Sequence, residues 1–184
     1  LVSPQNRDRY YWTNIENIKL PDDKHIMVSD IIENNVDKKY YLKKDYIYVP
    51  KNGNHKSKNG LKYVCGIISK KKWLDNGKNL SRNFSQGNRV YSIYGKSCCI
   101  NANAGGLGGK SGLYYLENGK EFSKDNIRRL TPLETERLQT LPDNYTEGIS
   151  ETNRYKCIGN GWTVDVIAHI FKNIEIHRSL DLTV

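Results

Sequence analysis

Arginines near the amino terminus have the clearest binding chemistry in this sequence. Arg7 and Arg9 are separated by one residue and follow Gln5. A guanidinium presents a rigid fork of donors that suits a carbonyl or phosphate oxygen. The composition fits an anionic partner such as nucleic acid, because 29 Lys and Arg against 20 Asp and Glu give a net charge of +9. Two plainer explanations stay open, surface salt bridges for the arginines and solubility for the charge surplus.

Further basic residues lie in the middle of the chain. Residues 70–72 are three lysines beside Trp73, and we expect a basic turn there that either contacts phosphates or is solvated. Residues 88–94 alternate in character, which predicts a strand with two different faces. Arg89 and Tyr91 would share one of these faces, with Tyr91 more suited to the core than to a ligand.

The segment 104–112 is rich in glycine and ends in Gly-Lys-Ser-Gly. A Walker-type phosphate loop needs a glycine five residues before Gly109, where this chain has Ala104, and a helix after the loop, where the residues predict a strand. We therefore expect no nucleotide triphosphate site. The segment fits better as a loop whose glycines, Gly105 and Gly106 among them, let the backbone approach a ligand.

The four cysteines, Cys65, Cys98, Cys99 and Cys157, lack the spacing of a zinc site, so no metal is expected. No apolar run approaches the about 20 residues of a membrane span, and no signal peptide is recognisable. We expect a cytoplasmic protein with reduced thiols. Because the first residue is Leu1, we also expect the natural protein to extend beyond it.

Short helices and strands must position these side chains. Thr131 to Glu134 form a capping box with proline at the first helical position, and Gly159 is expected to end a later helix. The last helix carries an apolar stripe that needs a partner surface. The expected strands are 10–15, 61–68, 88–94 and 113–116, with a hairpin at 118–119; the expected helices are 28–32, 131–141, 150–158 and 164–174.

Three separated blocks resemble, in order, the carboxy-terminal motifs of DNA cytosine-5 methyltransferases. The blocks are residues 4–9 (Pro-Gln-Asn-Arg-Asp-Arg), residues 128–139 with Pro142-Asp143, and residues 158–161 (Ile-Gly-Asn-Gly) with Val164. Residues 86–92 and the glycine segment resemble the recognition loops of small bacterial and phage enzymes. Each block alone has an ordinary structural explanation, so the fixed order carries the resemblance.

The resemblance implies a DNA-binding role for each matched residue. A cytosine that is methylated at C5 must first leave the duplex stack. By resemblance, Arg9 contacts the flipped cytosine, Arg7 supports the pocket and Gln5 lies near the phosphate backbone. Gln86 is expected to enter the gap and offer the orphan guanine both a donor and an acceptor. Arg89 is expected to read a guanine in the major groove.

The resemblance also implies a cofactor and shows two departures. Asn160, Gly161 and Trp162 are expected beside S-adenosylmethionine, although Gly161 replaces the commoner serine or alanine and helix capping is a rival explanation. Cys99-Ile100 stands where the family's recognition loop usually has a threonine and an aliphatic residue, both in contact with DNA. A thiol is a weaker hydrogen bonder than a hydroxyl, which puts the backbone contact there in doubt.

The family's nucleophile is a cysteine that follows a proline, and no cysteine here does so. The glycine-rich cofactor motif is absent, and residues 33–36 (Glu-Asn-Asn-Val) only superficially match the Glu-Asn-Val motif. We expect this chain alone to be inactive. It is then a fragment of a full enzyme, the recognition subunit of a split enzyme, or a non-enzymatic DNA-binding module; a tRNA cytosine-5 methyltransferase fragment is a lesser alternative.

These patterns predict an α+β fold in which a small β-rich target-recognition domain with short helices carries segments of a Rossmann-like α/β catalytic domain. Residues 1–19 are expected to end the catalytic domain, 20–150 to form the target-recognition domain, and 151–184 to return to the catalytic domain as helices. The expected partners are double-stranded DNA and the missing catalytic portion or subunit. Restriction-modification and phage self-modification are the candidate biological roles.

Overall fold

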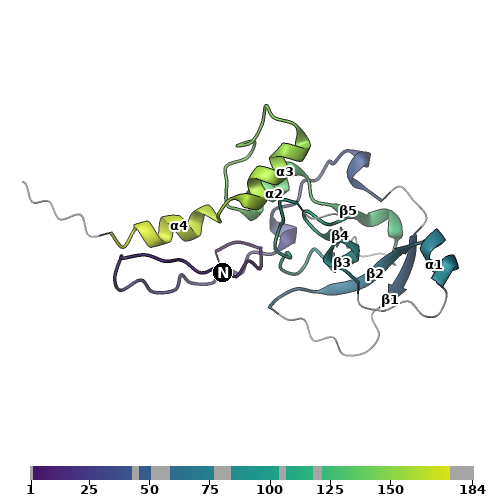
Figure 1. The fold of residues 1–184 in the computed structure, drawn as a ribbon, viewed down its shortest axis with the longest axis horizontal. Helices are drawn as coiled ribbons and strands as arrows, with labels where there is room; N and C mark the ends of the chain where they lie inside the picture. Colours follow the sequence, from purple (N-terminus) through teal and green to yellow (C-terminus); the bar gives the residue numbers. More distant parts are fainter. Residues whose placement is uncertain are drawn as a thin grey trace, which may run out of the picture.

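The computed structural model describes residues 2–42, 46–50, 59–76, 84–103, 107–117 and 122–174. They form a five-stranded sheet with helices around it (Figure 1), which confirms the predicted mixture of strands and short helices. The strands are β1 (Tyr46–Pro50), β2 (Tyr63–Ser69), β3 (Arg89–Ser92), β4 (Leu113–Tyr115) and β5 (Ile127–Arg129). The α-helices are α1 (Lys70–Asn76), α2 (Pro132–Leu138), α3 (Glu151–Asn160) and α4 (Val164–Phe171), and 3-10 helices span Val28–Asp30, Lys38–Tyr40, Gln86–Asn88 and Lys124–Asn126.

The strands lie in sequence order across the sheet, and every neighbouring pair is antiparallel except β3 and β4, which are parallel. Two hydrophobic clusters form the core, and adjacent β3 residues enter different clusters. Val90 packs with residues of β2, β4 and β5, whereas Tyr91 packs with residues such as Leu138 and Ile158 from α2 and α3. Both faces of β3 are therefore covered, and Tyr91 is a core residue as predicted.

The capping box predicted before α2 is present. The Thr131 hydroxyl accepts a hydrogen bond from the Glu134 amide, and the Glu134 carboxylate accepts one from the Thr131 amide at 2.8 Å. Pro132 occupies the first helical turn, where its missing N–H costs no hydrogen bond. The helix ends at Leu138, earlier than predicted, because Thr140 adopts a positive φ of 55°.

Glu136 of α2 holds the loop that follows this helix. Its buried carboxylate accepts hydrogen bonds from the amides of Asn144 and Thr146, both at 2.8 Å, and from Arg154 Nη2 at 2.9 Å. Burial raises the pKa of Glu136, but the hydrogen bonds from Thr146 and Arg154 outweigh it and hold the pKa below its ordinary value of 4.5.

A folded-state pKa below the unfolded value gives stability that is present above the unfolded pKa and is lost as pH falls through the folded one. We therefore expect the free energy of unfolding to decline below about pH 4.5, the unfolded value of Glu136. Glu136→Gln should flatten this decline in urea unfolding measured across the acid range. Glu147→Gln, at an exposed position of the same loop, is the control. An unchanged pH slope in Glu136→Gln would contradict the assignment.

Several predicted elements differ from the structure. The strand predicted at 10–15 was wrong: no described strand pairs with this segment, and Tyr10 and Trp12 are 93% and 94% exposed. Residues 70–72 begin helix α1 instead of a turn, since lysine is a good helix former and no glycine or proline interrupts the segment. The hairpin predicted at 118–119 lies outside the described residues.

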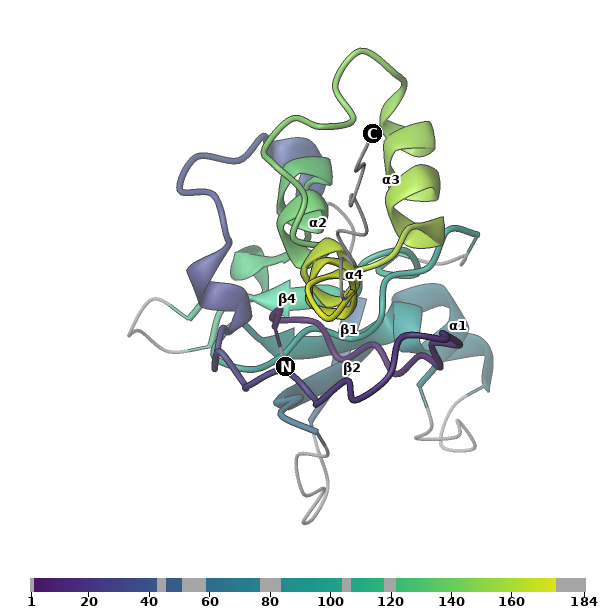
Figure 2. The same cartoon turned by 90° about the vertical axis from the view of Figure 1, so that its left-hand side faces the viewer.

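Residues 10–27 and α4 project together from the body of the molecule, and we call this projection the arm (Figure 1). Figure 2 looks along α4 and shows the amino-terminal segment beside it. Lys24 Nζ lies 2.8 Å from the Asp165 carboxylate, and His169 Nε2 lies 2.8 Å from the Lys19 carbonyl oxygen. The arm exposes large hydrophobic side chains, namely Tyr10, Trp12, Leu20, Val164 and Phe171.

Membrane-spanning helices and metal-binding clusters are both absent from the described ranges. No helix there is long and apolar enough to cross a membrane. Within the same ranges, histidine, cysteine and carboxylate side chains form no group of three or more that is placed to hold a metal ion.

Candidate nucleic-acid interface

Arg7 joins the amino-terminal segment by hydrogen bonds to two other parts of the site. Its Nη1 donates to the Ile100 carbonyl oxygen at 3.1 Å, and its Nη2 donates to the carbonyl oxygens of Gly159 at 3.2 Å and Gly161 at 2.9 Å. The guanidinium therefore joins the connection between β3 and β4 to the end of α3. Four of the hydrogen bonds that the Arg7 guanidinium donates are thus made within the protein.

Gln5 is a buried anchor. It is 2% exposed; its Oε1 accepts from the Ile100 amide at 3.0 Å, and its Nε2 donates to Gln139 Oε1 at 3.3 Å. Both ends of the amide are used inside the protein, so this arrangement differs from the phosphate contact expected for Gln5. The burial of Gln5 could not be predicted from its motif, because it depends on hydrogen bonds to Gln139 and Ile100, which are distant in sequence.

Gln139 is the last residue of the matched block 128–139, and the sequence predicts no role for it in the site. It is fully buried, and its Nε2 donates to the carbonyl oxygens of Ile158 at 2.9 Å and Gly161 at 3.1 Å. Its Oε1 also accepts from the Thr163 hydroxyl at 2.9 Å. Gln139 thus links α2 to the turn between α3 and α4. Its position at the end of the second matched block was the available signal.

Arg9 extends from the same segment into an open cleft of about 540 Å³. Arg9 is exposed, with Nη1 donating to the Asp8 carbonyl oxygen at 2.7 Å and Nη2 lying 3.4 Å from Cys99 Sγ. The cleft is lined by Arg7, Arg9, Asn101, Ala102, Asn103, Gly159 and Asn160. Two cationic and three amide side chains thus line a space where they are able to bind oxygen and ring-nitrogen atoms.

Gly159 permits the close approach that forms one wall of this cleft. A side-chain carbon at Gly159 would lie 2.5 Å from the Ala102 amide nitrogen and 2.7 Å from the Asn101 carbonyl carbon. Any larger residue would push α3 away from the loop at 101–103. The prediction that Gly159 ends the helix was wrong, because α3 continues to Asn160. The glycine serves close packing of the backbone.

Of the two residues predicted to read bases, Gln86 contacts the loop before this wall, and Arg89 contacts the segment before β3. Gln86 is half-buried in the 3-10 helix before β3, and its Nε2 donates to the Cys99 carbonyl oxygen at 2.9 Å. Arg89 opens β3 with an exposed side chain whose Nε donates to the Phe84 carbonyl oxygen at 2.6 Å. Gly105 and Gly106 lie outside the described residues. Gly108, after them, donates its amide hydrogen to the Gly87 carbonyl oxygen at 2.8 Å.

Cys99 and Ile100 occupy the centre of this arrangement. Ile100 is buried in the core, so only its backbone faces the site. Cys99 is half-buried, and its sulfur lies 3.3 Å from Arg7 Nη1. The neighbouring Cys98 is buried, and burial raises the pKa of its thiol to about 11. The Cys98 thiol is therefore neutral near pH 7 and unsuited to nucleophilic attack.

The predicted cofactor residues divide between two surfaces. Asn160 is exposed in the arginine cleft, whereas Trp162 is 64% exposed at the edge of an apolar groove of about 430 Å³. Gly161 contributes its carbonyl oxygen to Arg7 and Gln139. The groove runs between α4 and the loop after α2; its apolar lining includes Leu141, Tyr145, Ile158, Val164, Ile167 and Phe171.

Comparison with known proteins decides the family. The sequence profile of the family described as C-5 cytosine-specific DNA methylase matches residues 3–176. The chain belongs to this family. The resemblance inferred from the three motif blocks is therefore confirmed, and the relatives in this family are methyltransferases.

The similar sequences include bacterial and phage methyltransferases. An orphan methyltransferase, M.Rho11sI, from Bacillus phage rho11s is 41% identical over 48% of this chain and 18% of its own length. The type II methyltransferase M.HhaI from Haemophilus parahaemolyticus is 37% identical over 48% of this chain and 25% of its own length. M.HpaII from Haemophilus parainfluenzae is 28% identical over 93% of this chain and 46% of its length. The chain thus spans less than half the length of each.

Solved structures share the fold. The Entamoeba histolytica methyltransferase EhMeth superposes with a TM-score of 0.56 at 20% identity, over 92% of this chain and 48% of that protein. A Spodoptera frugiperda DNMT2 mutant gives a TM-score of 0.51 at 18% identity, over 93% of this chain and 53% of that protein. The fold of these residues is therefore that of one part of a methyltransferase.

Proposed function

We propose that this chain is the DNA-recognition and base-flipping portion of a DNA cytosine-5 methyltransferase. The observation that carries the proposal is the convergence of three separated segments on one cleft: the arginine motif, the connection between β3 and β4, and the end of α3. Residues 20–150 form the target-recognition domain, and residues 1–19 and 151–184 join it to the catalytic domain.

The site residues divide into those that hold the cleft together and those that face DNA. Gln5 and Arg7 are bonded within the protein, so they shape the cleft. Arg9 is exposed at the cleft and donates to the carbonyl oxygen of the flipped cytosine or to a nearby phosphate. Gln86, moving from its bond with Cys99, fills the space left in the duplex, and Arg89 reads a guanine edge.

S-adenosylmethionine, which the family implies, supplies an electrophilic methyl group when bound. Trp162 fits one wall of its site, because an exposed indole beside an apolar groove suits packing against a planar ring. Asn160 fits as an exposed amide on the cleft side of the same turn. Between these two residues, the Gly161 carbonyl oxygen accepts hydrogen bonds from Arg7 and Gln139. The main part of the pocket belongs to the catalytic portion.

The exposed side chains of the arm favour contact with a larger partner, which carries the proline–cysteine nucleophile. Tyr10, Trp12 and Phe171 expose large hydrophobic surfaces that are costly to leave in water. Co-purification with a larger chain that contains a proline–cysteine dipeptide is the expected result.

The relatives bear on the biological role of the protein, and its cysteines bear on its cellular compartment. The type II and orphan phage methyltransferases among the relatives favour modification of host or phage DNA, including protection against restriction. All four cysteines are free, which fits the reducing cytoplasm. A non-enzymatic DNA-binding module is the second candidate, favoured by the surplus of basic side chains.

Selection of duplexes from a randomised DNA pool tests the proposal. Enrichment of one short sequence is expected, with an affinity whose logarithm falls linearly with the logarithm of the salt concentration. Equal enrichment of all sequences would favour the non-enzymatic module. Preference for structured RNA over duplex DNA would favour the tRNA enzyme, and absence of binding to either would end the proposal.

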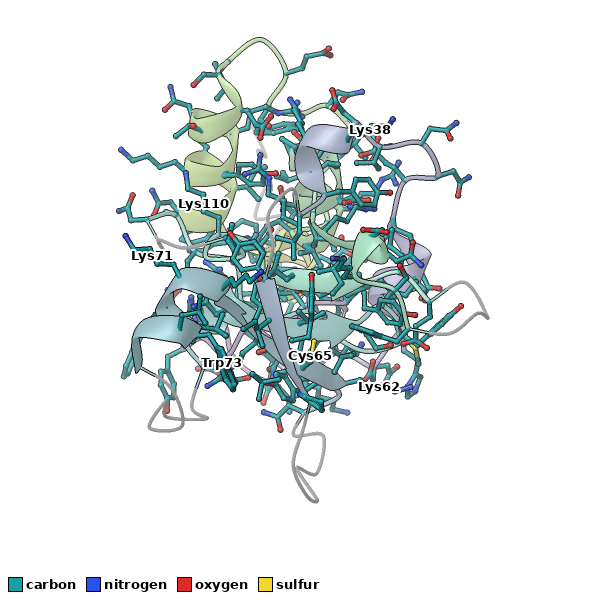
Figure 3. The ribbon with its side chains drawn as sticks, turned by 90° about the vertical axis from the view of Figure 1, so that its right-hand side faces the viewer. Lys38, Lys62, Cys65, Lys71, Trp73 and Lys110 are labelled. Atoms are coloured by element: carbon teal, nitrogen blue, oxygen red, sulfur yellow. The ribbon has the colours of Figure 1, made fainter. Side chains whose placement is uncertain are left out.

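Arg89→Ala and Lys71→Ala should affect DNA binding differently. Arg89 is placed to read a base, so its loss should remove about 1–3 kcal/mol of discrimination at one position. Lys71 lies on the outer side of α1, on the same side of the molecule as Lys110 (Figure 3), and suits a phosphate contact. Its loss should weaken every sequence alike and lower the salt slope by about one. If both substitutions lowered the affinity for all DNA sequences equally, Arg89 would not be a base-reading residue.

A further inference from the structure

Residue 99 contacts three side chains of the site from two other segments. Its sulfur lies 3.3 Å from Arg7 Nη1 and 3.4 Å from Arg9 Nη2, and its carbonyl oxygen accepts from Gln86 Nε2 at 2.9 Å. Arg7 and Arg9 belong to the amino-terminal segment, whereas Gln86 precedes β3. One residue therefore links the arginines of the cleft to the segment that enters DNA in the proposed function.

The two guanidiniums need an acceptor between them. Both carry a full positive charge and repel each other, and Arg9 is exposed with Asp8 as its other bonded partner among the described contacts. A long exposed side chain loses rotamer entropy when it is fixed. A half-buried sulfur that accepts from both guanidiniums offsets part of this cost, because bonds to charged donors are stronger than neutral ones.

We propose that Cys99 is a positioning residue that holds Arg7 and Arg9 toward the cleft through its sulfur and, until DNA is bound, Gln86 through its carbonyl oxygen. The inference rests on the proposed function and adds a role that does not require the thiol to touch DNA. Cys99 acts as an acceptor, so a hydroxyl in the same place should replace it. An apolar group of the same size should not.

The pair Cys99→Thr and Cys99→Val tests this role, because threonine and valine have the same shape and differ in the acceptor. The probe is the duplex DNA enriched from a randomised pool by the unmodified chain, with binding measured by fluorescence anisotropy. Cys99→Thr should bind within about twofold of the unmodified chain, and Cys99→Val should bind about three- to tenfold more weakly. Equal affinities of the two variants would overturn the proposal.

A readout without DNA separates this inference from the proposed function. Side-chain ¹⁵N NMR of the arginine Nε and Nη groups reports how firmly the guanidiniums are held. Arg9 should become more mobile in Cys99→Val than in Cys99→Thr, while Arg137, which pairs with Asp143 elsewhere, should be unchanged. If the unmodified chain binds no DNA, the proposed function fails and the NMR comparison still decides the role of Cys99; equal Arg9 mobility in both variants overturns it.

Discussion

Glu134→Ala should destabilise the protein by about 3–5 kcal/mol, the cost of leaving one partner of a buried ion pair without the other. Arg128 Nη1 and Nη2 donate to the two Glu134 carboxylate oxygens at 2.7 and 2.6 Å, and both side chains are almost completely buried. Burial alone lowers the pKa of Arg128, but the hydrogen bonds and charge of Glu134 outweigh it and raise the pKa. The guanidinium therefore stays charged, and without Glu134 it lies unpaired in the core.

Urea unfolding followed by circular dichroism measures this loss. The matched control is the double variant Arg128→Leu with Glu134→Ala, which removes both charges and should recover part of the stability. Recovery is expected to be incomplete, because Glu134 also accepts hydrogen bonds from the amides of Thr131 and Glu33, both at 2.8 Å. A loss below about 1 kcal/mol in Glu134→Ala would show that water enters and solvates Arg128.

The purified chain alone should transfer no methyl group from S-adenosylmethionine to DNA. The family reaction requires a cysteine thiolate, and no cysteine here follows a proline. Burial raises the pKa of Cys98 to about 11 and of Cys65 to about 12, so neither is a thiolate near pH 7. Radiolabelled methyl transfer to duplex DNA is the measurement.

Addition of a catalytic portion with the proline–cysteine dipeptide should restore methyl transfer. Arg9→Ala is the informative variant in the restored reaction, since loss of its cleft contact should lower kcat by at least about tenfold. Lys124→Ala, at an exposed position in the turn before β5, is the control and should behave as the unmodified chain. Methyl transfer by the chain without any partner would refute the assignment of the nucleophile to another polypeptide segment.

Local patterns predicted the elements that depend on local chemistry. The capping box of α2, the strands β2 and β4 and the buried position of Tyr91 are confirmed. These elements follow from side-chain periodicity and from hydrogen bonds between residues that are near in sequence. The strand predicted at 10–15 failed because a strand needs a neighbour, and strand propensity carries no information on whether that neighbour is present.

The motif order predicted which segments form the site better than it predicted what each residue does. It singled out the arginine motif, Cys99-Ile100 and Asn160, and the structure brings these segments to one cleft. It did not predict the burial of Gln5, because a sequence motif does not distinguish a ligand contact from a hydrogen bond inside the protein. Packing of Gln5 against Gln139 decided this, across a separation of 134 residues.

The parallel pairing of β3 and β4 has a consequence for how such proteins diversify. Parallel neighbours cannot be joined by a tight hairpin, so the chain must travel from one end of the sheet to the other before β4 begins. That excursion, from Ile93 to Gly112, contains the loop at 99–103. Cys98 and Ile100 of this excursion are buried in the core. Exchanges that keep these two residues therefore alter the surface that the proposed function offers to DNA without removing core packing. Grafting this excursion between homologues is the natural route to new sequence preferences.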